Sequence, residues 1–239
     1  MAPLKAPGAP STGVHKPSPA RAAFRIRELQ ERDLAAVVRA HREQFPDGFY
    51  SQLGDRFVWA YFREYLRSSG SVGLVATTTD SDELVGYLIG TVNQSAHDRD
   101  IYRRSAPALA SAGAAALARR PAELGLFIRT RAVGYLRRYV RGVRKSVRSA
   151  DQEPQVGELL YIYTAKEHRR KGCGAVLLRA FVEEAQRANT TCLELVTEQG
   201  NVNAREFYAH RGWSEKTSLH ARDGRPLLRL ELPLTGGAA

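Results

Sequence analysis

The sequence predicts an α/β fold, in which helices cover the faces of a central β-sheet. Short alternating or apolar runs typical of strands interleave with segments whose apolar residues recur every three or four positions, as in helices. The 239 residues are 43% hydrophobic and 26% charged, which is enough apolar material for one core. The two cysteines, Cys173 and Cys192, exclude a disulfide framework and a four-cysteine zinc site.

The two ends of the chain differ in composition from its middle. Residues 1–22 are rich in Pro, Ala, Gly and Ser, and they predict a disordered tail. Residues 23–234 are expected to form a single domain, followed by a flexible C-terminus at 235–239. The N-terminus has no apolar segment of a secretory signal, and no apolar run approaches the roughly 20 residues that span a membrane. A cytoplasmic protein without a membrane span is therefore expected.

The first part of the domain predicts the order strand, helix, helix, strand, strand. Phe24–Arg27 alternates apolar and basic residues, as a half-buried strand does. Asp33 is a candidate N-cap for the first helix, which the breaker Pro46-Asp47-Gly48 follows. Gly70 ends the second helix. The expected strands lie at 24–27, 72–78 and 84–92, and the two expected helices lie at 33–44 and 53–66.

The excess positive charge lies in one segment, residues 95–150. This segment holds 13 of the 36 basic and three of the 25 acidic residues, leaving 23 basic and 22 acidic residues elsewhere. A near-neutral protein with one basic segment favours an inserted functional element over a general nucleic-acid-binding surface. Within the insertion, 126–148 predicts a basic amphipathic helix. It could contact an anionic substrate as a lid, dock on an acidic partner, a membrane surface or RNA, or be simply solvated.

The second part of the domain continues the alternation of strands and helices. The expected strands are at 158–164, 191–197, 213–217 and 227–232, and the expected helices at 174–189 and 204–210. The six histidines are scattered along the chain, and none pairs with another His or Cys at the spacing of metal ligands. We therefore expect no metal site.

The most informative stretch is the basic turn, residues 169–175 (Arg-Arg-Lys-Gly-Cys-Gly-Ala), between a predicted strand and a predicted helix. Two glycines let the backbone approach a ligand closely, and the N–H groups at a helix start point outward. Three adjacent cations favour phosphate as that ligand. The spacing matches neither a Walker loop nor a dinucleotide-binding fingerprint. Taken alone, the turn could also be a tight strand-to-helix connection.

The basic turn resembles the pyrophosphate-binding motif of the GNAT superfamily of N-acetyltransferases, Arg/Gln-x-x-Gly-x-Gly/Ala. Here the motif reads Arg169-x-x-Gly172-x-Gly174, and the family's downstream pattern follows as Asn201-x-x-Ala204-x-x-Phe207-Tyr208. The resemblance is strongest over 157–218. It implies a mixed, mostly antiparallel central sheet flanked by helices. Residues 95–150 depart from the minimal family pattern, in which a short turn joins the third and fourth strands, and they predict a helical insertion at that point.

The resemblance also implies a binding site for acetyl-CoA as co-substrate. The main chains of Ile162 and Thr164 are expected to contact the thioester and the pantetheine arm, and Asn201 to contact the arm. Amides of the basic turn are expected to surround the pyrophosphate; they belong to Arg169, Arg170, Lys171, Gly172, Cys173, Gly174 and Ala175. Cys173 is expected to be a packing residue and not a nucleophile.

The chemistry needs an acid and a route for the amine proton. Tyr208 is the candidate acid for the departing thiolate, although its ring could instead only pack on the sheet. Glu158 is the candidate base, with a surface charge as the alternative reading. Glu198 is a second candidate, and an ordered water could also serve. The backbone N–H of Ile162 could stabilise the developing oxyanion.

The acceptor loop, residues 43–50, is expected to recognise the substrate. Within it, Asp47 and Tyr50 are the candidate contacts for a cationic amine, whereas Phe45 and Phe49 could pack on the core. The expected activity is acetyl transfer to a primary amine of a small metabolite, such as an amino sugar or an antibiotic. A protein lysine or N-terminal acetyltransferase, and a non-catalytic binding module, are the alternatives. The sequence leaves open whether the chain forms a homodimer.

Overall fold

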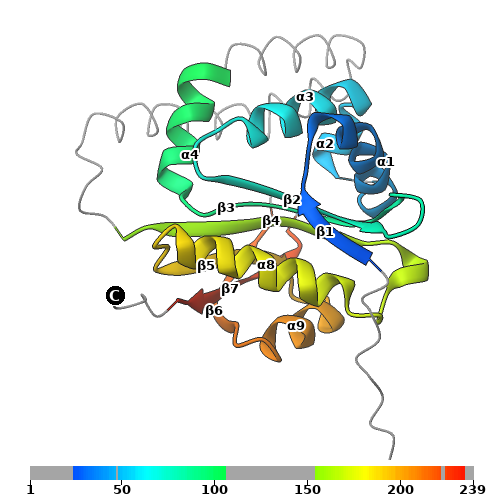
Figure 1. The fold of residues 1–239 in the computed structure, drawn as a ribbon. Helices are drawn as coiled ribbons and strands as arrows, with labels where there is room; N and C mark the ends of the chain where they lie inside the picture. The colour runs from blue at the N-terminus through cyan, green and yellow to red at the C-terminus, as the bar shows by residue number, and fades with distance from the viewer. Residues whose placement is uncertain (1–23, 47, 106–153, 222–223, 235–239) are drawn as a thin grey trace, which may run out of the picture.

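The computed structural model describes residues 24–46, 48–105, 154–221 and 224–234, which form one seven-stranded sheet with helices on both faces (Figure 1). The predicted tail, most of the basic insertion, the helix at 126–148, Asp47 and the C-terminus at 235–239 lie outside these residues. The strands are β1 (Phe24–Glu28), β2 (Ser71–Thr78), β3 (Leu84–Thr91), β4 (Val156–Thr164), β5 (Cys192–Glu198), β6 (Ser214–His220) and β7 (Pro226–Pro233).

The helices follow the sequence expectations closely, with two additions. The longer ones are α1 (Leu34–Gln44), α3 (Asp55–Leu66), α8 (Cys173–Arg187) and α9 (Val202–Ala209), and the short 3₁₀ turns are η1 (Glu31–Asp33) and η5 (Lys166–His168). Two helices were not expected as separate elements: α2 (Phe49–Gln52), inside and just after the acceptor loop, and α4 (Gln94–Asp100), which continues into the π-helical turn η2 (Ile101–Ser105).

The predicted N-cap at Asp33 has a different role from the one expected. Asp33 precedes α1, but its side chain makes no capping hydrogen bond to that helix. Its carboxylate instead accepts two hydrogen bonds from the guanidinium of Arg27, at 2.7 and 2.9 Å, and one from the backbone N–H of Gln30. A carboxylate held by a two-pronged guanidinium is engaged away from the helix start. Asp33 therefore joins β1 to η1.

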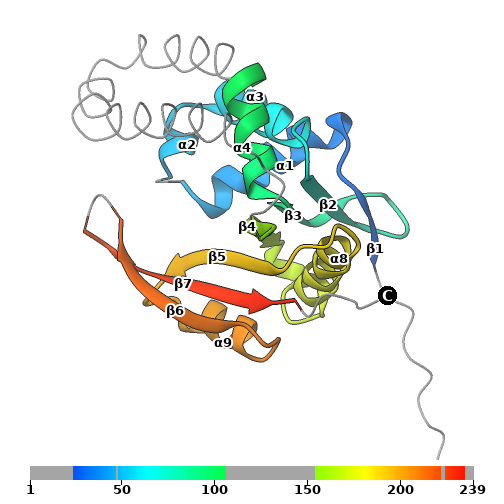
Figure 2. The same ribbon diagram turned by 90° about the vertical axis from the view of Figure 1, so that its left-hand side faces the viewer.

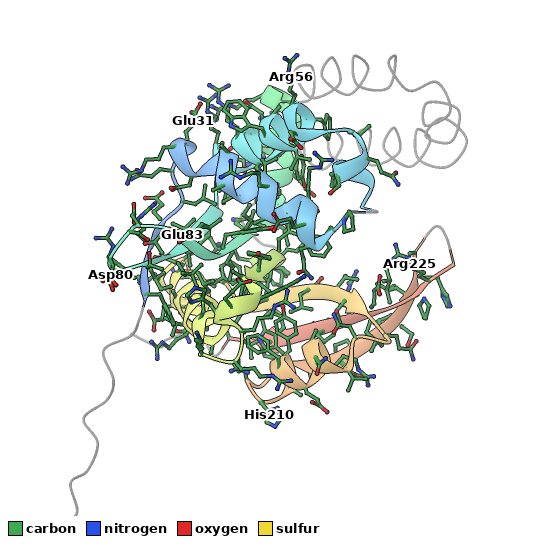
Figure 3. The ribbon with its side chains drawn as sticks, turned by 90° about the vertical axis from the view of Figure 1, so that its right-hand side faces the viewer. Glu31, Arg56, Asp80, Glu83, His210 and Arg225 are labelled. Atoms are coloured by element: carbon green, nitrogen blue, oxygen red, sulfur yellow. The ribbon has the colours of Figure 1, made fainter. Side chains whose placement is uncertain are left out.

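The sheet has the order β1-β2-β3-β4-β5-β7-β6, and all neighbours are antiparallel except β4 and β5. This confirms the expected mixed, mostly antiparallel sheet. Helices α1 to α4 cover one face, whereas α8 and α9 cover the other (Figure 2). In Figure 3, the labelled Glu31 and Arg56 mark the first layer and His210 the second, while Asp80 and Arg225 lie at opposite ends of the sheet.

Each face of the sheet has its own hydrophobic core. Against α1 and α3 the core contains Val37, Phe62 and Tyr87, all fully buried. Against α8 it contains Leu177, Phe181 and Leu193. These residues recur at helical spacing on α8 and at alternate positions on the strands, as the sequence pattern predicted. Strands β3 and β4 contribute side chains to both cores, so β4 lies in the centre of the molecule.

A β-bulge changes the direction of side chains in β4. Ile89 of β3 pairs with Tyr161, but the next residue, Gly90, pairs with Leu159, so Leu160 is the extra residue. As a result, Leu160 and Tyr161 both pack against the core under α1 and α3, whereas Leu159 and Ile162 pack against the core under α8. Bulges of this kind redirect side chains beside functional sites.

Candidate active site

Strand β4 has one paired side and one unpaired side along most of its length. Its parallel pairing with β5 covers only Val156–Glu158, after which the two strands separate. On the other side, β4 pairs with β3 as far as Thr164. We call the side of residues 159–164 that lacks a partner strand the free edge of β4. Backbone groups on such an edge are available to an extended ligand.

The hydrogen-bond pattern shows which backbone groups belong to the free edge. The N–H of Ala165 donates to the carbonyl of Val85 at 2.8 Å, so the backbone N–H of Ala165 points toward β3. Successive residues of a strand alternate in the direction of their backbone groups. The N–H and C=O groups of Ile162 and Thr164 therefore point toward the free edge. These are the two residues from which the sequence predicted main-chain contacts.

The basic turn at the end of β4 presents a row of unused amides. No backbone N–H from Arg170 to Ala175 donates to an acceptor among the described residues, which gives six consecutive donors. Arg170 and Gly172 have φ angles of 60° and 86°, in the left-handed region, a backbone shape typical of concave turns whose successive amides bind an anion. The 15-residue helix α8 begins at this point and adds the positive end of its dipole.

The two glycines of the turn have different structural roles. A Cβ at Gly172 would meet no atom within 4 Å, so it is the left-handed backbone that favours glycine there. At Gly174, a Cβ would lie 3.5 Å from the Thr164 hydroxyl and 3.6 Å from the Phe207 ring, which is ordinary contact. Gly174 therefore lies where the end of β4, the start of α8 and α9 meet.

Cys173 is buried between these glycines. Burial raises the pKa of its thiol, opposed by a hydrogen bond with the Thr164 side chain. A neutral, buried thiol is a packing group, since the thiolate is the reactive form. That Cys173 packs and does not act as a nucleophile stays a prediction.

Tyr208 lies on α9, with its ring in the core under α8. It contacts Phe207 edge to face at 5.1 Å and Trp213 at 5.6 Å between ring centroids, and it is 6% exposed. Burial raises the pKa of its phenol well above the usual value of about 10, so the hydroxyl stays protonated at neutral pH. The ring thus packs in the core, as the alternative to a catalytic acid expected. The hydroxyl makes no hydrogen bond to the described residues.

Asn201 begins α9, where its side-chain oxygen accepts a hydrogen bond from the backbone N–H of Ala204 at 3.2 Å. Asparagine is a favoured N-cap, so this residue type is explained by helix geometry alone. Its side chain is exposed, and the cap leaves the amide NH₂ as a donor. The sequence pattern did not reveal this capping role.

Glu158 occupies the last position at which β4 still pairs with β5, opposite Glu194. Its side chain is half-buried, and its charge acts on the buried phenol of Tyr65, whose pKa is raised mainly by burial and further by Glu158. Tyr65 belongs to α3, so Glu158 faces the layer of α1 to α4. The expected base therefore lies on the opposite face of the sheet from α8.

Aromatic residues gather on the face that Glu158 shares. Tyr50 stacks on Tyr61 at 4.6 Å between centroids, while Phe45 and Tyr161 are 5.7 Å apart. Of the two residues expected to contact the amine, only Tyr50 is described. Tyr161 and Tyr163 were not predicted as site residues, although their spacing of two in β4 puts both rings on this face.

His41 lies beneath this aromatic cluster. It is 2% exposed, its Nδ1 lies 3.2 Å from the Tyr87 hydroxyl, and its ring packs edge-on against Tyr161 at 4.7 Å. Burial lowers the pKa of His41 to about 4, so it is neutral at physiological pH. The helical periodicity placed His41 on the buried face of α1, but only the structure shows that it supports β4.

The strand edge and the basic turn together indicate the kind of ligand that this protein can bind. An unpaired strand edge continues into a row of six amides at a helix start, which suits a long, extended ligand that ends in phosphates. Among the described residues, no group of three His, Cys, Asp or Glu side chains could hold a metal ion. No helix in the described ranges is long and apolar enough to cross a membrane.

Comparison with known proteins gives the family. Residues 100–213 match the model of the acetyltransferase (GNAT) family. The chain therefore carries a GNAT acetyltransferase domain, as the two sequence motifs indicated, and its sheet and helices have the GNAT fold. No curated protein matches this sequence.

Solved structures share the fold at low sequence identity. A GCN5-related N-acetyltransferase from Kribbella flavida is similar with a TM-score of 0.56 and 14% identity, over 89% of this chain and 98% of that one. The ribosomal-protein-S18-alanine N-acetyltransferase from Escherichia coli gives 0.52 and 15%, over 90% and 98%. The structure of yncA from Salmonella typhimurium with its cofactor acetyl-CoA gives 0.52 and 17%, over 91% and 97%.

Proposed function

We propose that this protein is an acetyl-CoA-dependent N-acetyltransferase that transfers an acetyl group to a primary amine of a small metabolite. An amino sugar or an antibiotic would fit this class. The observation that carries the proposal is the junction of the free edge of β4 with the six unused amides of Arg170–Ala175. A phosphate-ended thioester laid along that edge meets backbone donors at both of its polar parts.

The residues present fit acetyl-CoA in two ways. The amides from Arg170 to Ala175 and the exposed side chains of Arg170 and Lys171 would hold the phosphates. The backbone groups of Ile162 and Thr164 would hold the pantetheine arm, and the Asn201 amide NH₂ would add a donor from α9. When bound, acetyl-CoA supplies the thioester whose acetyl group is transferred.

The chain's own groups would then manage charge and protons. The Ile162 N–H, which points toward the free edge, would stabilise negative charge on the carbonyl oxygen. Glu158, directly or through water, would take a proton from the attacking amine. Tyr208 would give its proton to the sulfur as the carbon–sulfur bond breaks and the carbon–nitrogen bond forms, which balances the reaction. The raised pKa of Tyr208 keeps that proton available at neutral pH.

The first test is binding of acetyl-CoA to the full chain by calorimetry, with a mixture of adenosine and inorganic phosphate as the control. Stoichiometric binding that falls with rising salt is expected, since cations and amides contact phosphate. Absence of acetyl-CoA binding would overturn both the site and the function. Loss of affinity in Lys171→Met, with an unchanged melting temperature, would support the placement of the phosphates.

The second test is an acetylation screen with glucosamine, spermidine, tyramine, and a peptide with a free N-terminal alanine and an internal lysine. Faster acetylation of one small amine than of the peptide is the expected result. A peptide that reacts faster than every small amine would establish a protein acetyltransferase instead. Acetyl-CoA binding without turnover of any amine would favour a non-catalytic module.

A further inference from the structure

Arg169 opens the phosphate-binding motif, yet its side chain is engaged elsewhere. Its Nε donates to the carbonyl oxygen of Thr164 at 3.2 Å, and its Nη2 donates to Oε1 of Gln44 at 3.0 Å. Thr164 is the last residue of β4, and Gln44 is the last residue of α1. One guanidinium therefore connects β4 with α1, although Arg169 and Gln44 are 125 positions apart in the sequence.

The backbone of Arg169 is engaged as well. Its N–H donates to the carbonyl of Lys166 at 3.3 Å, which completes the turn η5. The unused amides begin one residue later, at Arg170. Arg169 thus differs from Arg170 and Lys171, for which no described hydrogen bond or ion pair restrains the side chain.

Gln44 holds the start of the acceptor loop. The next residue, Phe45, packs its ring against His41 at 5.1 Å and against Tyr161 at 5.7 Å, and its N–H donates to the His41 carbonyl. The chain then turns into α2, where Tyr50 stacks on Tyr61. Fixing Gln44 therefore fixes the point from which the acceptor loop leaves α1.

Electrostatics place the guanidinium of Arg169 on the same side of β4 as the acceptor loop. Burial is the main cause of the raised pKa of Tyr163; Glu43 raises it further, whereas Arg169 opposes the shift. Tyr163 packs on the core under α1 and α3, and its ring stacks on Tyr87 at 5.5 Å. The charge of Arg169 is thus felt on the acceptor face, together with that of Glu43 from α1.

We propose that Arg169 is a positioning residue for the amine: it ties the acceptor loop, through Gln44, to the end of the cofactor strand at Thr164. Binding of the phosphates is left to Arg170, Lys171 and the six amides. This inference rests on the proposed acetyltransferase function. It assigns the first arginine of the motif to the amine side of the reaction, where the motif by itself suggests a phosphate contact.

The consequence is a division of kinetic effects between neighbouring arginines. Arg169→Met keeps the length of the side chain but removes both hydrogen bonds. It should raise the KM of the amine about fivefold, the usual effect of one exposed charged hydrogen bond, and leave the Kd of acetyl-CoA within about twofold. Arg170→Met should do the reverse, weakening acetyl-CoA about fivefold at low salt while leaving the KM of the amine unchanged.

Gln44→Ala distinguishes the effect of the Arg169–Gln44 connection (the tie) from the effect of the positive charge in the basic turn. It removes the other end of the connection and leaves Arg169, Arg170 and Lys171 in place, so it should reproduce the rise in the KM of the amine. Arg169→Lys, which keeps the charge but lacks the fixed fork of the guanidinium, should restore part of the loss. The amine used is the fastest substrate among glucosamine, spermidine, tyramine and the peptide.

Hydrogen exchange provides a readout that requires no amine. Amides of residues 43–53 should exchange several-fold faster in Arg169→Met and in Gln44→Ala than in the wild type, both with and without coenzyme A. Arg170→Met should leave their exchange unchanged. Melting temperatures of all variants verify that each is folded.

The outcomes separate this inference from the proposed function. A wild type that binds no acetyl-CoA would overturn the function, and the role of Arg169 with it. An active wild type with a silent Gln44→Ala variant, in both kinetics and exchange, would overturn only the tie. The tie would equally be wrong if Arg169→Met and Arg170→Met weakened acetyl-CoA by the same factor and left the KM of the amine unchanged.

Discussion

Strand β4 pairs with its two neighbouring strands to different extents. Strand β3 pairs with β4 through Thr164, the rings of the paired Tyr87 and Tyr163 stack, and a buried His41–Tyr87 contact supports the pairing from beneath. Strand β5 pairs over only three residues and then separates. The same strand thus has a closed, buried side and an open side whose backbone groups have no partner strand.

This difference shows how a β-strand can be both a structural element and a binding surface. The β3 side supplies the rigidity, since Tyr87, Leu88 and Ile89 are fully buried. The β5 side supplies the donors and acceptors, since an edge without a partner strand must find one. The site needs both, because an unsupported edge would not hold its groups at fixed positions. The four predictions below test one side or the other.

The largest effect is expected at Tyr208, the proposed acid for the reaction of a thioester bound on the open side. In Tyr208→Phe the ring and its packing remain but the proton donor is lost, so kcat should fall about 100-fold with little change in the Kd of acetyl-CoA. Rapid-mixing kinetics with the fastest amine measure this under conditions where chemistry limits the rate. Full turnover in the variant would show that the tyrosine only packs, as the alternative reading of the sequence holds.

A pH titration tests the closed side. Burial lowers the pKa values of His41 and His97 to about 4, whereas both would titrate near 6.5 in the unfolded chain. Between these values the unfolded state binds more protons. This contribution to stability is therefore complete above pH 6.5 and is lost as the pH falls toward 4, by about 3 kcal/mol for each histidine.

Urea unfolding at several pH values checks this expectation. His41→Leu should flatten the slope between pH 6.5 and 4, because it removes one of the two titrating groups. Stability that stays constant across this interval in the wild type would contradict the buried, neutral state of both histidines. The acetyl-CoA affinity of His41→Leu at neutral pH would then show whether support from beneath reaches the open side.

Gly172→Ala sharpens the comparison at the end of the open side. Alanine is strained at φ 86°, so the amides should lose their concave arrangement and the Kd of acetyl-CoA should rise about tenfold. Gly174→Ala is the matched control, since its Cβ would make only ordinary contacts and Kd should change less than about twofold. Equal effects of the two variants would argue against a backbone cause.

The smallest effect is expected far from β4, at the hairpin between β6 and β7. Arg225 pairs with Glu198, and both side chains are more than half exposed. Exposed ion pairs contribute little, so Arg225→Ala should change the free energy of unfolding by less than about 0.5 kcal/mol. Thermal unfolding measures this, and a loss above about 1 kcal/mol would mean that the hairpin contributes more to the sheet than its exposure indicates.

Much of the fold follows from local patterns in the sequence. The helix expected at 174–189 is α8 (Cys173–Arg187), and the strand expected at 84–92 is β3 (Leu84–Thr91), because apolar periodicity directly reflects which side is buried. The basic turn was found because its glycines and cations are consecutive. Short elements such as α2 were not predicted, since four residues are too few to show the periodicity of a helix.

The site was only partly accessible in this way. The sequence indicated the residues of the free edge, Ile162 and Thr164, only through a family resemblance, because the edge exists where β5 diverges from β4. The buried partner of His41 and the capping role of Asn201 were missed for different reasons. His41 meets Tyr87 across 46 positions, and an Asn before a helix has the same letter whether it caps, binds a ligand or does both.

The sequence by itself determined the strands, the helices and the basic turn, since each depends on neighbouring residues and on their spacing. Only the tertiary structure decided which side of β4 stays open and where the side chain of Arg169 is held. Both depend on contacts between distant segments: β4 with β5 in the first case and Arg169 with Gln44 in the second. A motif specifies a local backbone shape, but the partner that a side chain finds depends on what the fold brings beside it.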